Sequence, residues 1–567
     1  MRYASSGVAR FDKLSRIPGW ILRTGMWFAR FRFMKLISKA TFLIVLILNL
    51  PAALQGASCS QKPGRASASG LYTAGSKLCW NGKPVKLTGY GTTDLATRDG
   101  YDYSAFLNTI RYVPNIDPDQ RHGVNLTRIW ATGTSNSPDC FHTPADHDPG
   151  QPPTTMPFQY LKGESCTAQN PYPKYNMCIS DVACAKSVGL SETYTERLQN
   201  ILDEARKNGI IVELVLFDGY FMGKRNDTDL TPLYARNPWN PLHNNMGKKK
   251  FRKFPGATTL AACNKLYRSK NELDTTGYPF PEIYDICDDT RTTQGCDATL
   301  NCLGLIQKAY VESMVDLVKD NDGGSDHVFF EVMNRTRYDR DDPGFDFEKL
   351  KRWHDVVGYW IKCRSDDDCR NSRGDYLVSA GLGVADYSDL VCTKPASCPE
   401  NTLDVFKMPN IDIVSLPAHT WNNTPGAPGP CRSAGIAVNK FRKPVIIDTD
   451  GTPNDRNDKC QIQRWATEAA FCSINGAPNA GRVHFNHLDG MTFGDNIDKR
   501  CKFTGAGRPL NLNFDERYLD CHTLDTIGDA GPTYLSDIAG TPPTATCPHS
   551  TSTQGKPVWC SDPCLGQ

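Results

Sequence analysis

The sequence has no excess of charge of either sign, and this absence argues against partners that are strongly charged. It holds 64 Lys and Arg against 62 Asp and Glu among 567 residues, a formal net charge of +2. Domains that bind nucleic acid carry a basic patch or stripe, and none stands out here. We therefore expect no nucleic-acid partner. Hydrophobic residues make up 39% of the chain, enough for a large core, which excludes a wholly disordered protein.

The N-terminal part lacks a hydrophobic run of membrane-spanning length. Its apolar stretch, Ala40–Leu50, is short against the roughly 20 residues that a spanning helix needs. Met34 precedes it, Lys35 and Lys39 supply positive charge, and small residues follow near position 58. This order predicts a secretory signal peptide over 34–58 that is removed, leaving no membrane contact. The alternative is a signal anchor that stays in the membrane.

The predicted signal peptide divides the N-terminal region into three parts. The basic residues 1–33 stand ahead of it and are interpreted as an upstream extension, with Met34 as the true start. Residues 59–75 are rich in Ser, Gly, Ala and Lys and are predicted to be a linker.

The cysteines lack the recurring CxxC spacing that is typical of metal knuckles. There are 22 of them, an even number, spread from Cys59 to Cys564. Such usage favours disulfides and an oxidising compartment, so we expect a secreted, extracellular protein. Metal binding is the alternative that the count leaves open. No cofactor is expected.

Apolar runs typical of buried parallel strands alternate with helical stripes along the chain. One stripe precedes the third strand and comprises Tyr194, Leu198, Ile201, Leu202 and Ala205. The eight predicted strands are Val85–Gly89, Asn125–Trp130, Ile210–Phe217, Val328–Met333, Tyr376–Ser379, Ile411–Leu416, Val445–Ile447 and Val483–Phe485. Eight such units predict an α/β fold, a (β/α)8 TIM barrel over residues 76–500.

Two long insertions interrupt this barrel, at 134–190 and 219–300. Both follow strands, so we expect them at the C-terminal face of the barrel, where barrel active sites form. Both contain cysteines, which predicts that disulfides staple these loops. Residues 501–567 are rich in Thr, Pro, Gly and Cys and are predicted to be a disulfide-pinned C-terminal extension.

Several segments together resemble one family of barrels. They are LCWNGKPVKLTGYG (78–91), HGVNLTRIWATG (122–133), LDEARKNGIIVELVLFDG (202–219), HVFFEVMNRTR (327–337), DIVSLPAHTW (412–421) and KPVIIDTDG (443–451). In this order they are similar to glycoside hydrolase clan A, the family 5 cellulase-like barrels in particular, over about residues 80–500. The resemblance implies hydrolysis of O-glycosidic bonds in a polysaccharide or oligosaccharide, using one Glu at the end of the fourth strand and another at the end of the seventh.

The chain departs from this family at both glutamates. The fourth strand runs Glu331-Val-Met-Asn334-Arg335, so the motif's Asn is kept and Arg335 stands at the acid/base position. The seventh runs Asp448-Thr449-Asp450, which puts Thr449, or with a one-residue slip an Asp, at the nucleophile position. The pKa of an Arg side chain stays above about 12, so an Arg cannot usefully donate a proton. A Thr needs a base beside it to act as a nucleophile. Catalysis by the inherited pair of glutamates is therefore not supported.

Other carboxyl groups are the candidates for catalysis. Asp448 and Asp450 share a face at the rim of the seventh strand and are the first candidates, with capping of the next loop as the structural alternative. Strand alternation puts Glu331, Met333 and Arg335 on one face, so Glu331 is expected to point into the barrel. It is the third catalytic candidate, with an ion pair to Arg335 as the structural alternative.

The resemblance also implies residues that contact the sugar. Arg128 matches the second-strand Arg that orients the nucleophile, and His419 with Trp421 is similar to a sixth-strand motif near the sugar. Asp386 is a further carboxylate near the rim. The full set of predicted binding residues is Arg128, Asp218, Asn334, Arg335, His419, Trp421 and Asp489. His484 and His487 fall on opposite faces of their strand, so no metal site is expected there.

Two functions compete. One is a secreted glycoside hydrolase in which aspartates replace the glutamate pair. The other is a pseudo-glycosidase that binds glycan without cutting it, or an extracellular structural subunit, which Arg335 favours because it can clasp an acidic group. A weaker third is lyase-like chemistry of Arg335 on a uronate. The sequence leaves self-association open.

Overall fold

The computed structural model divides the chain into two units, Met1–Ser58 and Cys59–Gln567. All residues that the structure describes lie in the second unit. They are 59, 70–92, 95–97, 103–112, 123–132, 157–158, 189–219, 239, 281–287, 292–300, 302–321, 326–334, 347–365, 376–382, 402–417, 430–449, 472–474, 477–478, 481–489, 504–505 and 508–509. The predicted signal peptide lies outside them. Among the described helices, none is long and apolar enough to cross a membrane.

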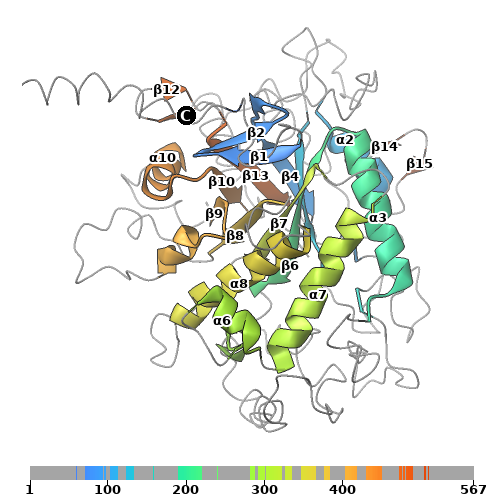
Figure 1. The fold of residues 1–567 in the computed structure, drawn as a ribbon. Helices are drawn as coiled ribbons and strands as arrows, with labels where there is room; N and C mark the ends of the chain where they lie inside the picture. The colour runs from blue at the N-terminus through green and yellow to red at the C-terminus, as the bar shows by residue number, and fades with distance from the viewer. Residues whose placement is uncertain are drawn as a thin grey trace, which may run out of the picture. The chain divides into compact units, whose positions relative to one another are not determined.

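Eight parallel strands close into a barrel in the order β10-β13-β4-β5-β6-β7-β8-β9 (Figure 1). This confirms the predicted (β/α)8 fold. The strands are β4 (Thr88–Thr92), β5 (Leu126–Trp130), β6 (Ile211–Asp218), β7 (Val328–Asn334), β8 (Val378–Gly381), β9 (Ile413–Pro417), β10 (Val445–Thr449) and β13 (Val483–Asp489).

The barrel strands form because near-continuous apolar runs are buried on both faces, as in a parallel sheet. Every residue of β6 is buried, and so is every residue of β7. Most strands extend past the predicted apolar run into polar residues at the C-terminal end, such as Asp218 and Asn334. The first barrel strand begins at Thr88 and not at the predicted Val85. Residues 85–87 lead into it, and the Val85 N–H donates to Leu78 O at 3.1 Å.

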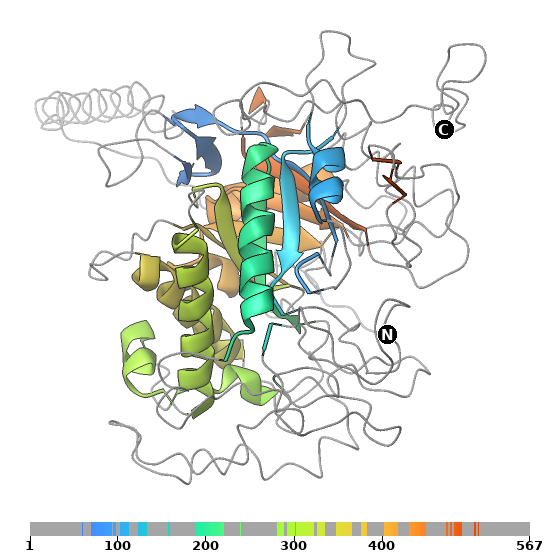
Figure 2. The ribbon, with the colours of Figure 1, turned by 90° about the vertical axis from the view of Figure 1, so that its right-hand side faces the viewer.

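Helices cover the outside of the barrel (Figure 1; Figure 2). In α3 the predicted stripe of five residues is confirmed as its buried face. Ser191 precedes this helix, and Arg206 and Lys207 in its last turn complement the helix dipole. The described helices are α2 (Tyr103–Ile110), α3 (Glu192–Lys207), η7 (Pro281–Tyr284), α6 (Thr293–Ala298), α7 (Cys302–Lys319), α8 (Phe347–Ser365), η10 (Thr402–Lys407) and α10 (Pro430–Phe441).

A three-stranded antiparallel sheet, which we call the hairpin after its β1–β2 pair, closes the end of the barrel where the strands begin. It consists of β1 (Leu71–Ala74), β2 (Lys77–Trp80) and β3 (Lys83–Pro84). Four residues of the predicted 59–75 linker therefore form a strand. Apolar side chains of the hairpin pack on the first inward-facing residues of the strands, and we call this cluster the apolar layer: Leu71, Leu78, Trp80, Val85, Leu87, Leu126, Ile211, Phe329, Ile413 and Ile446.

Three disulfides lie among the described residues: Cys59–Cys79, Cys287–Cys296 and Cys431–Cys472. The first ties the chain before the hairpin to β2. The second lies inside the predicted 219–300 insertion, with Cys296 in α6, which confirms that a disulfide staples this loop. Short strand pairs occur at β11 (Ser473–Ile474) with β12 (Ala477–Pro478), and at β14 (Thr504–Gly505) with β15 (Arg508–Pro509). The last pair lies in the predicted C-terminal extension.

Candidate active site

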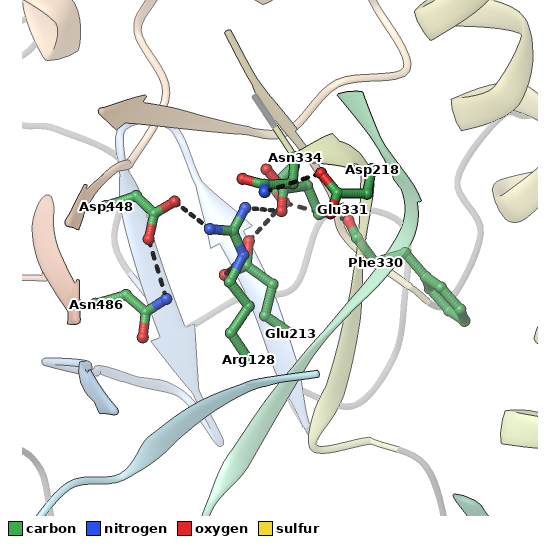
Figure 3. A network of polar contacts seen from close by, with 9 residues as sticks. Arg128, Glu213, Asp218, Phe330, Glu331, Asn334, Asp448 and Asn486 are labelled. Atoms are coloured by element: carbon green, nitrogen blue, oxygen red, sulfur yellow. Dashed lines mark hydrogen bonds and ion pairs between the residues drawn. The ribbon is translucent and has the colours of Figure 1, made fainter. Parts of the chain in front are cut away.

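One arginine joins acidic side chains from three strands inside the barrel. The Arg128 guanidinium of β5 donates to Asp448 of β10 through one terminal nitrogen and to Glu331 of β7 through the other. Its Nε lies 3.6 Å from Oε2 of Glu213 on β6. Figure 3 shows Arg128 between Asp448 and Glu331. We call Arg128, Glu213, Glu331 and Asp448 the charged layer.

The charged layer sits one inward-facing step above the apolar layer. Arg128, Glu213, Glu331 and Asp448 each follow a residue of the apolar layer by two positions: Leu126, Ile211, Phe329 and Ile446 in turn. Side chains alternate along a strand, so positions two apart share a face. In register Arg128 stands opposite Glu213. The barrel geometry therefore brings residues up to 320 positions apart into contact.

Three carboxyl groups share one buried guanidinium, and two of the three are as deeply buried as the guanidinium itself. Glu331 is 0% exposed, Arg128 and Glu213 are each 1% exposed. Burial raises the pKa of Glu213 to about 8 and that of Glu331 to about 7, although the charge of Arg128 opposes the rise. Burial by itself would lower the pKa of Arg128, but the three carboxylates outweigh it and raise this pKa. The arginine is therefore permanently charged, and the two glutamates have a reduced tendency to ionise.

Asp448 has the most complete set of partners in the layer. One oxygen accepts from Arg128, and the other accepts from Asn486 Nδ2 at 3.2 Å. Its side chain is 9% exposed, the highest value among the four residues. Asn486 lies opposite Asp448 on β13 and opposite Gly89 on β4. A Cβ at Gly89 would collide with the Asn486 oxygen, so glycine there makes room for the amide that holds Asp448.

A second polar pair lies at the C-terminal ends of β6 and β7. Asn334 Nδ2 donates to Asp218 Oδ1 at 3.3 Å, and both residues are at most 5% exposed. Figure 3 shows this pair above Glu331. Two predicted binding residues are thus in contact with each other, beside the charged layer.

Strand alternation fails at the end of β7. Glu331 points into the barrel, but Met333 packs in the outer core, where the Tyr284 hydroxyl is 3.7 Å from its sulfur. Across the strand pair, Phe217 also faces outward, with its ring 5.1 Å from that of Trp353 in α8. Regular pairing of β6 with β7 is interrupted one residue before Phe217 and Met333. The predicted common face of Glu331 and Met333 is therefore wrong.

The structure brings together five of the predicted site residues: Arg128, Asp218, Glu331, Asn334 and Asp448. It pairs Glu331 with Arg128, whereas the structural alternative from the sequence was Arg335. Asp489 ends β13, and its side chain is not described. The remaining predicted residues lie outside the described part of the chain: Arg335, Asp386, His419, Trp421 and Asp450.

Sequence reasoning missed three polar residues around the charged layer. Glu213 is flanked by apolar residues in β6, and Ser379 of β8 donates to its Oε1 at 2.8 Å. Asn486 is the third. The signal for Glu213 was available, because a charged residue in the middle of an apolar run requires a buried partner. His484, the inward-facing residue below Asn486, accepts from Leu87 N–H through Nδ1, and burial lowers its pKa to about 3.

Comparisons with known proteins give likeness in structure. An endo-1,4-β-mannanase from Rhizomucor miehei is 12% identical, with a TM-score of 0.42, over 81% of this chain and 98% of that one. An endo-β-1,4-mannanase from Thermotoga petrophila is 12% identical, with a TM-score of 0.40, over 79% and 77%. A Bacteroidetes-affiliated family 5 cellulase is 12% identical, with a TM-score of 0.38, over 80% and 96%.

At these identities and TM-scores the likeness assigns neither a family nor an activity to this chain. No protein-family profile matches it, and no curated protein matches its sequence. A shared barrel does not determine activity, because unrelated functions occur on this fold. The chemistry has to be argued from the charged layer and the strand ends above it.

Proposed function

We propose that this protein is a secreted glycoside hydrolase-like enzyme whose reactive carboxylate is Asp448. The observation that carries the proposal is the double hold on Asp448 by Arg128 and Asn486 at the C-terminal end of β10. Its side chain is also the most exposed in the charged layer. A carboxyl group fixed in this way is oriented and lies at the barrel face where active sites form.

Hydrolysis of a glycosidic bond requires a second carboxyl group. The two groups flank the bond, roughly 5–5.5 Å apart when the configuration is retained and 6.5–9.5 Å apart when it is inverted. Glu331 and Glu213 are too deeply buried to serve, at 0% and 1% exposed. We assign the role of proton donor to a rim aspartate, with Asp450 first because it follows Asp448 by two residues. The substrate is a polysaccharide or oligosaccharide.

Asp218 and Asn334 complete the proposed site. Asn334 matches the family's Asn before the acid/base position, and its amide is held by Asp218. In this proposal the Asn334 amide group meets a hydroxyl group of the sugar bound above Asp448. Asp218 keeps that amide in a fixed orientation.

A second function is favoured by one observation. Arg335 and Thr449 stand where the resembling family has its two catalytic glutamates. A barrel with this substitution can bind a glycan without cutting it, as a pseudo-glycosidase. The positive charge of Arg335 then suits an acidic sugar, which it can bind with two parallel hydrogen bonds.

The two functions are separated by reducing-sugar release and binding on a panel of mannans, cellulose, xylan and uronate-containing glycans. The enzyme is expected to release sugar from at least one of them, and Asp448→Asn to lose at least about 100-fold, the scale of removing one acid/base or charge-stabilising group. Asp450→Asn is run in parallel. Binding without release from any glycan would instead establish the pseudo-glycosidase.

Glu213→Gln is the matched control for Asp448→Asn. It removes one carboxyl group from the same layer, but from a residue that is farther from the C-terminal end of its strand. If the two variants lose activity equally, the loss comes from disturbing the layer, and the assignment of Asp448 as the reactive group fails. Activity kept in Glu213→Gln and lost in Asp448→Asn supports it.

A further inference from the structure

The charged layer contains more acid than its cation can balance. Three carboxyl groups contact Arg128, which is the one cationic group among the interactions that shift the pKa of Glu213 or Glu331 in the described structure. Asp218 adds a fourth acidic group near Glu331. His484 accepts through Nδ1 and is neutral, and Ser379 and Asn486 carry no charge. Full ionisation of the layer would leave a net negative charge in the barrel interior.

The three carboxyl groups differ in how well their charge is compensated. Both oxygens of Asp448 accept hydrogen bonds, one of them from Arg128. Glu331 uses one oxygen for Arg128, and its Oε1 is buried without a hydrogen-bond partner. Glu213 accepts from Ser379, but its other oxygen is 3.6 Å from Arg128 Nε, beyond a good hydrogen bond. Asp448 is thus the best place for the negative charge, and the glutamates are the poorer places.

We propose that the charged layer keeps one proton, carried by either Glu213 or Glu331. These two glutamates are positioning residues: because one of them is neutral, the positive charge of Arg128 is available to Asp448. An unpaired charge is costly in the interior, so a buried acid without full compensation remains neutral instead. Burial raises the pKa of both glutamates, which agrees with a retained proton. The retained proton does not depend on the proposed hydrolase, and it bears on that function only through the contact of Arg128 with Asp448.

Folding is expected to take up this proton. In the unfolded chain a Glu titrates near its ordinary value of about 4.3. In the folded layer one glutamate stays protonated until the pH approaches the raised pKa values of about 7 to 8. The stabilisation is therefore complete below the unfolded pKa and is lost as pH rises through the folded pKa. Across that window the unfolding equilibrium constant should rise by about tenfold per pH unit.

The test is the pH dependence of unfolding of the full chain, with Glu213→Gln and Glu331→Gln beside the wild type. Glutamine imitates the protonated acid and does not titrate. Replacing either glutamate leaves the other paired with Arg128 and free to ionise. We expect each variant to lose most of the tenfold-per-unit rise between about pH 5 and about pH 7. Glu204→Gln on α3, where Glu204 is outside the barrel, should keep it.

A measurement on the wild type protects the test from a variant that fails to fold. The infrared carbonyl band of a protonated carboxyl is distinct from the band of a carboxylate. It should be present in the folded protein at about pH 6 and disappear by about pH 9, above both folded pKa values. Equal pH slopes in wild type and both glutamine variants, or no such band, would overturn the proposal. Neither readout involves a glycan, so failure here is distinct from failure of the proposed hydrolase.

Discussion

Two successive layers inside the same barrel are built from the same strands and have opposite chemistry. The apolar layer holds Leu126, Ile211, Phe329 and Ile446, and the charged layer holds the residues two positions farther along. The first is closed by the hairpin and stabilises the fold by excluding water. The second is also buried, but it places three carboxyl groups around a single guanidinium. Within one barrel, residues two positions apart on the same strands therefore serve different purposes: the lower layer stabilises the fold, and the upper layer holds the groups for chemistry.

The largest expected effect is removal of the cation from the charged layer. Arg128→Met leaves three buried carboxyl groups without their partner, which should cost about 3–5 kcal/mol of unfolding free energy near neutral pH. The cost should shrink at lower pH, because protonation removes the uncompensated charges. Denaturant unfolding at several pH values measures both. A cost that does not change with pH would show that Arg128 contributes by packing alone.

A cavity in the apolar layer sharpens the comparison. Leu126→Ala removes a fully buried side chain directly below Arg128 and should cost about 3 kcal/mol. No titratable group is changed, so this loss should be the same at every pH where the protein folds. If Leu126→Ala showed the pH dependence expected for Arg128→Met, the two layers would not be separate in their energetics.

The packing between the layers is tested at Gly89. A Cβ there would collide with the Asn486 oxygen and lie 3.0 Å from the Leu126 side chain. Gly89→Ala should cost about 1–3 kcal/mol, because the tight core gives way only partly. It should also lower sugar release, because Asn486 would shift away from Asp448. Unchanged stability would mean that Asn486 moves freely and does not hold Asp448.

The smallest expected effect concerns the hydrogen bond from Ser379 to Glu213. Ser379→Ala should cost about 1 kcal/mol. This hydrogen bond lowers the pKa of Glu213, so its loss raises that pKa further. The cost should therefore be larger above about pH 8, where Glu213 is charged, than near pH 5. Unfolding of this variant beside Ser433→Ala, a buried serine on α10, checks this, and a loss equal at both pH values would contradict it.

The barrel itself was readable from the sequence, because its strands are buried on both faces and leave long apolar runs. What the runs could not reveal is where each strand ends, since the last residues are polar and belong to the site. Asp218 and Asn334 are examples. The change of facing direction at Phe217 and Met333 was also hidden, because it depends on how two strands pair.

Part of the candidate site followed from spacing and part did not. The resemblance placed Arg128 near the seventh strand, and the structure has it in contact with Asp448. Glu213 was overlooked because its neighbours make β6 appear wholly apolar. The sequence offered only Arg335, four positions farther along the chain, as an ion-pair partner of Glu331. Closure of the barrel brings Arg128 to Glu331 across 203 positions, which local patterns cannot show.

Chemical rescue tests the central claim, that Asp448 is the reactive carboxylate, most directly. Asp448→Ala and Glu213→Ala are assayed on the glycan that the wild type cleaves, with and without formate. Asp448→Ala should lose release by at least about 100-fold and regain part of it with formate, which can occupy the vacated position beside Arg128. Glu213→Ala should show no rescue. Wild-type release by Asp448→Ala without formate would contradict the account.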